Sequence, residues 1–316
     1  MDETPRSRLA FVDACRALAV LGMLFANMMN VFLRRVPEAL QHNEGDLLRA
    51  FDFPAAVFQF LIGVSLVLFL RKRTAGGLSA GRARLAAAWR FALLLVLGIV
   101  LDSAEALSPW PRWGVLQTLG LGGAVAAGVA SLPDTVAAAL ALGFLGLFFR
   151  GAWAEVHHSP FAALAFVPLT LGGLLVGRGL TSGAPPRAFV ARAGIVALAA
   201  IGWVALAQWA GVPFNKTIGT SSFVAVATAA SAALLLVTAA LERAGAAFPT
   251  WLLAVGANAL TAWVLQYVLV YYPRWLVFPA WRGLALLPGM AAVLAALAAL
   301  SALAVALGRR GIRIPI

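Results

Sequence analysis

One short polar stretch of the chain holds a residue that could do proton-transfer or acyl-transfer chemistry. Residues 39–54 read ALQHNEGDLLRAFDFP and place His42 among acidic and basic residues, between two strongly apolar segments. An unperturbed histidine has a pKa of about 6.5, so His42 could accept a proton from an amine or hydroxyl, or carry a group covalently. The alternative is a solvated loop that only joins two helices. The elements around the stretch decide between these interpretations.

The composition indicates an integral membrane protein. Of the 316 residues, 62% are hydrophobic and only 11% are charged, and the mean hydropathy is +0.92. Soluble domains carry roughly 25% charged residues. The net charge of +12 and the pI of about 11.5 would suit a nucleic-acid partner. The arginines lie between apolar segments and form no basic face, however, so we expect membrane lipids and no nucleic acid as surroundings.

Apolar runs close to the roughly 20 residues that cross a bilayer recur along the whole chain. Backbone groups in lipid must be hydrogen-bonded internally and alternating barrel strands are missing, so the fold class is predicted as all-α. We expect a polytopic transmembrane helical bundle in a single domain, residues 1–316, without convincing internal repeats. About ten spans are predicted, at 9–33, 51–70, 85–102, 114–132, 134–149, 161–177, 188–211, 218–241, 251–271 and 283–308.

The basic residues predict the orientation of these spans. With the N-terminus inside, fourteen Lys and Arg residues lie in cytoplasmic segments and eight lie outside. Cytoplasmic loops carry the excess of such residues. The two densest clusters, RKR…GRAR and the C-terminal GRRGIR, agree with this arrangement. Both termini are therefore predicted to be cytoplasmic, and the stretch around His42 is predicted to face outward.

The first span carries a polar stripe. Asp13 and Arg16 are three residues apart and can pair across one helical turn, and Asn27 returns to nearly the same face. Ionisable groups within spans are functional candidates because they are costly in lipid. A structural ion pair and an interhelical hydrogen bond are the alternatives for these residues.

The second span carries a similar stripe, in which Asp52, Gln59 and Gly63 share a face. Glycine there would let another backbone or a ligand come close, and Gln59 could equally be a link between helices. Two facing stripes could line a passage through the bilayer.

The predicted outward loops and span ends supply further candidates. SPWPRWGVLQTLG places Arg112 beside tryptophans, for which an interfacial aromatic belt is the alternative. The adjacent His157 and His158 are more typical of a solvated loop, and the three histidines form no recognisable metal site. The candidate ligand-binding side chains are Asp13, Arg16, Gln59, Arg112, Trp113, Gln117, Asn215, Lys216, Ser221 and Asn258.

The order of these motifs resembles the heparan-alpha-glucosaminide N-acetyltransferase family, which are multi-span membrane acyltransferases. The resemblance is carried by RLAFVDACRALAVLGMLFAN, the histidine loop, FDFPAAVFQFLIGVSL, PRWGVLQTLG, NKTIGTSSF and GANAL, and it covers most of the chain. Four departures stand out. Arg16 is followed by Ala17 where the family has Gly, the gap from Asn27 to His42 is longer, and the tryptophan expected shortly after the histidine is missing from HNEG. The aspartate expected four residues before Pro54 is replaced by Ala50, with Asp52 two residues before this proline.

The resemblance implies transfer of an acetyl group from cytoplasmic acetyl-CoA to an acceptor on the other face of the membrane. It implies that His42 is catalytic, as base or acetyl carrier, and that Asn27 donates a hydrogen bond to the thioester oxygen. It also implies no metal, a sugar, glycan or small-amine acceptor and a possible homodimer. The Ala- and Arg-rich composition suggests a bacterial inner membrane. A transporter or flippase for a small solute or lipid-linked sugar is the alternative function.

Overall fold

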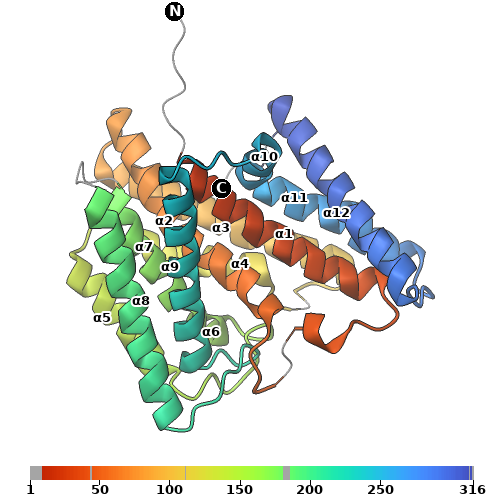
Figure 1. Ribbon diagram of the computed structural model, residues 1–316, viewed down its shortest axis with the longest axis horizontal. Coiled ribbons are helices and arrows are strands. Elements are labelled where there is room, and N and C mark those ends of the chain that lie inside the picture. Colours follow the sequence, from red (N-terminus) through yellow and green to blue (C-terminus); the bar gives the residue numbers. More distant parts are fainter. Residues whose placement is uncertain (1–8, 43–44, 111, 181–185, 313, 315–316) are drawn as a thin grey trace, which may run out of the picture. The chain divides into compact units, whose positions relative to one another are not determined.

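The structure is a computed structural model that describes residues 9–42, 45–110, 112–180, 186–312 and 314. The all-α prediction is confirmed, because the described residues form helices and no strand (Figure 1). The longer helices are α1 (Ala10–Phe32), α2 (Phe53–Ala75), α3 (Ala80–Ala106), α4 (Val115–Val129), α5 (Asp134–Leu147), α7 (Val167–Gly177), α8 (Pro186–Trp209), α9 (Ser221–Arg243) and α12 (Leu286–Arg309). The shorter ones are α6 (Pro160–Ala163), α10 (Thr250–Ala257) and α11 (Ala259–Gln266).

Several of these helices are long and apolar enough to cross a membrane. Among the described residues seven stretches pass this test, and an eighth passes if the bent pair of helices at 250–277 counts as one span. That pair breaks at Asn258 with a bend of 73°, so the predicted span 251–271 is not one straight helix. Helices α4 and α5, with 15 and 14 residues, are shorter than the usual span. The count of ten spans and the cytoplasmic termini stay predictions.

The chain packs as two compact units. The first unit comprises residues Met1–Gln41 and Leu234–Pro315, and the second comprises residues His42–Ala233. In the first unit, α10, α11 and α12 pack against α1 (Figure 1). In the second unit, α2 and α5 pack against α7, and α3 packs against α4. The prediction of a single domain is not tested by this division.

Glycines bring the backbones of α2 and α7 into direct contact. A Cβ atom at Gly63 would overlap with the carbonyl of Thr170, and a Cβ atom at Gly173 would overlap with the carbonyl of Phe60. The prediction that Gly63 lets another backbone approach is therefore confirmed, and that backbone belongs to α7. Small residues serve the same purpose at many helix contacts in membranes.

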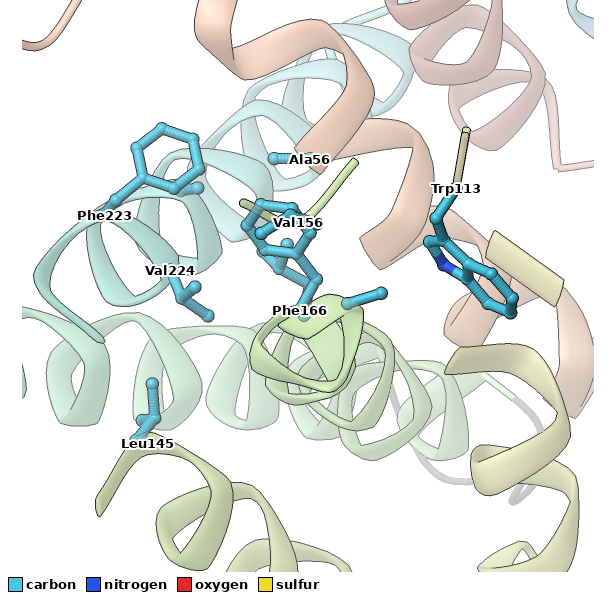
Figure 2. Close-up of a cluster of buried hydrophobic side chains, with 10 residues drawn as sticks. Ala56, Trp113, Leu145, Val156, Phe166, Phe223 and Val224 are labelled. Carbon is cyan, nitrogen blue, oxygen red and sulfur yellow. The ribbon is translucent and has the colours of Figure 1, made fainter. Parts of the chain in front are cut away.

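A cluster of buried hydrophobic side chains lies in the second unit. Figure 2 shows Ala56 of α2, Phe166 of the 3₁₀ turn Leu164–Phe166, and Phe223 of α9 gathered with Trp113 and Val156 from loops. The ring centroids of Phe166 and Phe223 are 6.1 Å apart in an edge-to-face arrangement, which is a favourable aromatic geometry. The cluster joins loops and helices that are distant in sequence.

Replacement of Gly63 by Val is expected to destabilise the second unit. The added side chain meets backbone atoms of α7, which cannot rotate away, so overpacking should cost about 1–3 kcal/mol or prevent folding. Gly194→Val on α8 is the matched control, because a Cβ atom there meets nothing within 4 Å. Thermal unfolding of both variants in detergent measures the difference, and equal melting temperatures would contradict the close contact.

Candidate active site

A fully buried carboxylate lies at the start of α2 in the second unit. Asp52 has no exposed surface, and its Oδ2 accepts a hydrogen bond of 2.9 Å from the backbone N–H of Arg49. Its Oδ1 lies 3.7 Å from the Lys216 Nζ and 3.9 Å from the His42 Nδ1. A buried charge without a counter-ion is strongly destabilising, so the ammonium of Lys216 compensates Asp52. The arrangement joins a carboxylate, an ammonium and an imidazole.

The environment keeps His42 neutral. Burial of the ring, followed by the positive charge of Lys216, lowers the pKa of His42 to about 4, although Asp52 acts in the opposite direction. The imidazole is therefore uncharged at neutral pH, as a proton acceptor or nucleophile must be. About a third of the side chain, 34%, is accessible, so a reactant can reach it.

The loop before α9 supplies Lys216 and secures the loop of His42. Asn215 donates a hydrogen bond of 2.9 Å from Nδ2 to Asp46, and its Oδ1 accepts one of 3.2 Å from the backbone N–H of Ile218. Burial lowers the pKa of Lys216, while Asp52 opposes this effect. The predicted ligand-binding pair Asn215 and Lys216 thus contacts acidic residues near His42.

A cavity of about 60 Å³ opens beside Asp52 and Lys216. One water needs roughly 10–15 Å³, so the space suits a reacting group and is too small for a whole coenzyme or sugar. Its polar lining includes Gln59 and Thr118, and its apolar wall includes Phe166 and Phe223 of the hydrophobic cluster (Figure 2). His157, which the sequence placed on a solvated loop, also lines this cavity.

His157 and Trp113 are bonded to each other twice. The backbone N–H of Trp113 donates to the carbonyl of His157 at 2.8 Å, and the His157 Nδ1 lies 3.1 Å from the carbonyl of Trp113. Trp113 itself is buried, with 4% exposure, whereas Trp110 is 56% exposed. The predicted ligand-binding residue Trp113 therefore forms part of the core and holds His157.

Arg112 and Gln117 are engaged by the buried carboxylate of Asp102. Arg112 donates to Asp102 Oδ1 from Nε at 3.0 Å and from Nη2 at 2.8 Å, and it also pairs with Glu105. Gln117 donates to Asp102 Oδ2 at 2.8 Å, so the carboxylate is bonded on both oxygens. These contacts fix the segment that carries Trp113.

Two other predicted residues of the second unit make structural contacts. Gln59 donates from Nε2 to the Thr170 hydroxyl at 3.1 Å and to the Thr118 carbonyl at 3.4 Å, and so links α2 to α7 and α4. Ser221 is buried and donates to the carbonyl of Phe149 at 2.9 Å. Gln59 also lines the cavity, whereas Ser221 is not among its lining residues.

The remaining predicted residues belong to the first unit. Asp13 and Arg16 form the expected ion pair at 2.7 Å, which confirms their pairing across one turn. Asn27 donates from Nδ2 to Gln266 Oε1 at 3.2 Å. Asn258 lies at the break between α10 and α11, donates to the carbonyl of Ala254, and its buried Oδ1 has no hydrogen-bond partner among the described residues.

Two site residues were not predicted as such. Asp52 appeared only as a member of a polar stripe, and His157 only as a solvated loop residue. The signal for Asp52 was a carboxylate just before Pro54, at the start of a strongly apolar helix. Asn43 and Glu44, which share the loop of His42, lie outside the described residues. In the part of the chain that is described, no group of three or more His, Cys, Asp or Glu side chains could hold a metal ion.

Comparison with known families gives one match. Residues 8–182, more than half of the 316, match the family described as heparan-alpha-glucosaminide N-acetyltransferase, catalytic. The matched part contains Asn27, His42, Asp52 and His157, and Lys216 follows it. A search of curated proteins found no match.

Removal of the Lys216 charge is expected to raise the pKa of His42 above about 4. Lys216→Met deletes a positive charge that disfavours the imidazolium, whereas Asp52 would still favour it. NMR titration of histidine-labelled protein measures this, since the chain has only three histidines. Lys72→Met, at an exposed position of α2, is the control and should leave the pKa unchanged. An unchanged pKa in the Lys216 variant would reject the electrostatic coupling.

Proposed function

The chain belongs to the heparan-alpha-glucosaminide N-acetyltransferase family, and from this premise we propose that it moves an acetyl group from cytoplasmic acetyl-CoA to an extracytoplasmic acceptor. The acceptor is an amine or hydroxyl of a sugar or glycan, or a small amine. The observation that carries the proposal is a neutral, accessible His42 beside the buried Asp52 and Lys216. We further propose that the membrane is a bacterial inner membrane and that the chain can form a homodimer.

In the proposed reaction the acceptor attacks the carbonyl carbon of an acetyl group. The new bond joins this carbon to the nitrogen or oxygen of the acceptor, and the bond to the sulfur of CoA breaks with its electron pair on sulfur. His42 acts at this centre either as the base that takes the acceptor's proton or as a nucleophile that carries the acetyl group between donor and acceptor. Its lowered pKa supports both roles, because each requires the neutral ring.

Asn27 is proposed to stabilise the charge that develops on the thioester oxygen. An amide nitrogen has two hydrogens, and the hydrogen bond from Asn27 to Gln266 uses one of them. The second hydrogen can be donated to an oxyanion, an interaction worth roughly 3–4 kcal/mol in other enzymes.

The other predicted ligand-binding residues receive different proposed roles. Asp13, Arg16 and Asn258 remain candidates for contact with acetyl-CoA, because part of the Arg16 side chain stays accessible beside Asp13 and the Asn258 Oδ1 has no hydrogen-bond partner among the described residues. The side chains of four further residues are already paired with acidic side chains; these residues are Arg112, Gln117, Asn215 and Lys216. We propose that they position the site and do not bind acetyl-CoA directly.

Replacement of His42 by Ala is expected to lower acetyl transfer by at least ~100-fold, because the neutral ring is lost as base or acetyl carrier. The assay uses purified protein in detergent, acetyl-CoA, and a panel of glucosamine, N-acetylglucosamine and ethanolamine. Release of CoA and the acetylated product are both measured. The melting temperature of the variant verifies folding, and retained turnover would reject the catalytic role of His42.

A wild-type protein that binds no acetyl-CoA at millimolar concentration would favour the transporter alternative.

Replacement of Asn27 by Ala is expected to lower kcat by about 10²–10³, as loss of one oxyanion donor does elsewhere. The KM for acetyl-CoA should change little, since the bond strengthens only in the transition state. Asn30→Ala is the matched control, because Asn30 lies one turn further along α1 and is exposed. Equal kcat values for the two variants would remove Asn27 from the mechanism.

A further inference from the structure

The tautomer of His157 is fixed by its bond to the backbone. A carbonyl oxygen can only accept a hydrogen bond, so the Nδ1 that lies 3.1 Å from the Trp113 carbonyl must carry the proton. The neutral ring then has its lone pair on Nε2. The reciprocal bond from the Trp113 N–H to the His157 carbonyl also fixes the backbone at this position. A histidine held in this way resembles a general base whose second nitrogen is oriented by a partner.

His157 combines this fixed tautomer with access to the cavity. It lines the cavity together with Asp52 and Lys216, so a reactant in the cavity can reach this residue. Burial of the ring lowers the pKa of His157, and the charges of Lys216 and Arg112 act in the same direction, whereas the Trp113 carbonyl and Asp102 oppose the shift. His42 is also within electrostatic range. At neutral pH the ring is therefore uncharged.

We propose that the Nε2 of His157 is the base that accepts the proton of the acceptor during acetyl transfer. This inference rests on the proposed acetyltransferase function and deepens it, because it assigns a second imidazole to the same site. Neither the sequence nor the family match gives His157 a role. The roles proposed for His42 and Asn27 do not involve it either.

The chemistry of this step balances with the groups present. The acceptor nitrogen or oxygen forms a bond to the acetyl carbon, and the bond from that carbon to its leaving group breaks. The electron pair departs with the CoA sulfur or, if His42 carries the acetyl group, with the His42 nitrogen. The proton of the acceptor passes to the His157 Nε2. The Trp113 carbonyl and the buried carboxylate of Asp102 favour the resulting imidazolium, which returns the proton to the leaving group or to water.

The adjacent His158 differs from His157 in its surroundings. His158 is mostly exposed, with 65% of its side chain accessible, and its Nδ1 lies 3.1 Å from the Glu155 carboxylate. It is not among the residues that line the cavity. His157 and His158 therefore share a loop and a residue type but differ in the fixed tautomer and in cavity access, so His158 provides a matched control.

The test compares His157→Gln and His157→Ala with His158→Gln and His158→Ala in the full chain, in detergent, with acetyl-CoA and the acceptor panel. His157→Gln should lower kcat by about 10²–10⁴, the usual contribution of a general base, while the KM for acetyl-CoA stays within about two-fold. The His158 variants should behave as wild type. Added imidazole should restore part of the activity of His157→Ala, because it can fill the vacated site and accept the proton.

Each result distinguishes the inference from the function on which it rests. If wild-type protein acetylates no acceptor and releases no CoA, the proposed function fails. If wild type is active and His157→Gln matches His158→Gln, the role of His157 is rejected while the function stands. If His157→Ala is folded and inactive but imidazole restores nothing, His157 only braces the Trp113 segment, and the inference is also overturned.

Discussion

The need to compensate Asp52 determines how the second unit is built around its site. A carboxylate removed from water loses several kcal/mol of solvation, which only nearby donors and cations can offset. Arg49 supplies a backbone N–H, and Lys216 supplies a positive charge from a distant loop. Because Lys216 already provides the counter-ion, His42 need not be protonated to satisfy Asp52. The same ammonium disfavours the imidazolium, so His42 stays neutral and chemically useful.

The rigid helices beneath the site keep these loop residues in place. Gly63 and Gly173 bring α2 onto α7, and Gln59, about two turns after Asp52, links α2 to α7 and α4. The loops are held by two further contacts: Asn215 donates a hydrogen bond to Asp46 of the histidine loop, and His157 is hydrogen-bonded to Trp113. Functional groups on loops that are pinned to a rigid scaffold combine access with fixed geometry.

Local features of the site could be predicted from the sequence, whereas its long-range contacts could not. The Asp13–Arg16 pair and the small residue at Gly63 follow from helical periodicity, and both were found. The pairing of Asp52 with Lys216 joins segments far apart in sequence, and no periodicity encodes it. Polarity marked Arg112 as a ligand candidate but could not reveal that Asp102 engages it. The break at Asn258 also escaped prediction, because an uninterrupted apolar sequence can form either a straight or a bent span.

The contacts of Asp52 show that the site extends beyond the part of the chain that matches the family. The match ends at residue 182, yet the cation that compensates Asp52 is Lys216. The positive charge of Lys216 also disfavours a proton on His42, whereas Asp52 favours one. Without Lys216, His42 would therefore be less suited to act as a neutral base. The segment around Lys216 therefore belongs to the proposed catalytic site together with the histidine loop.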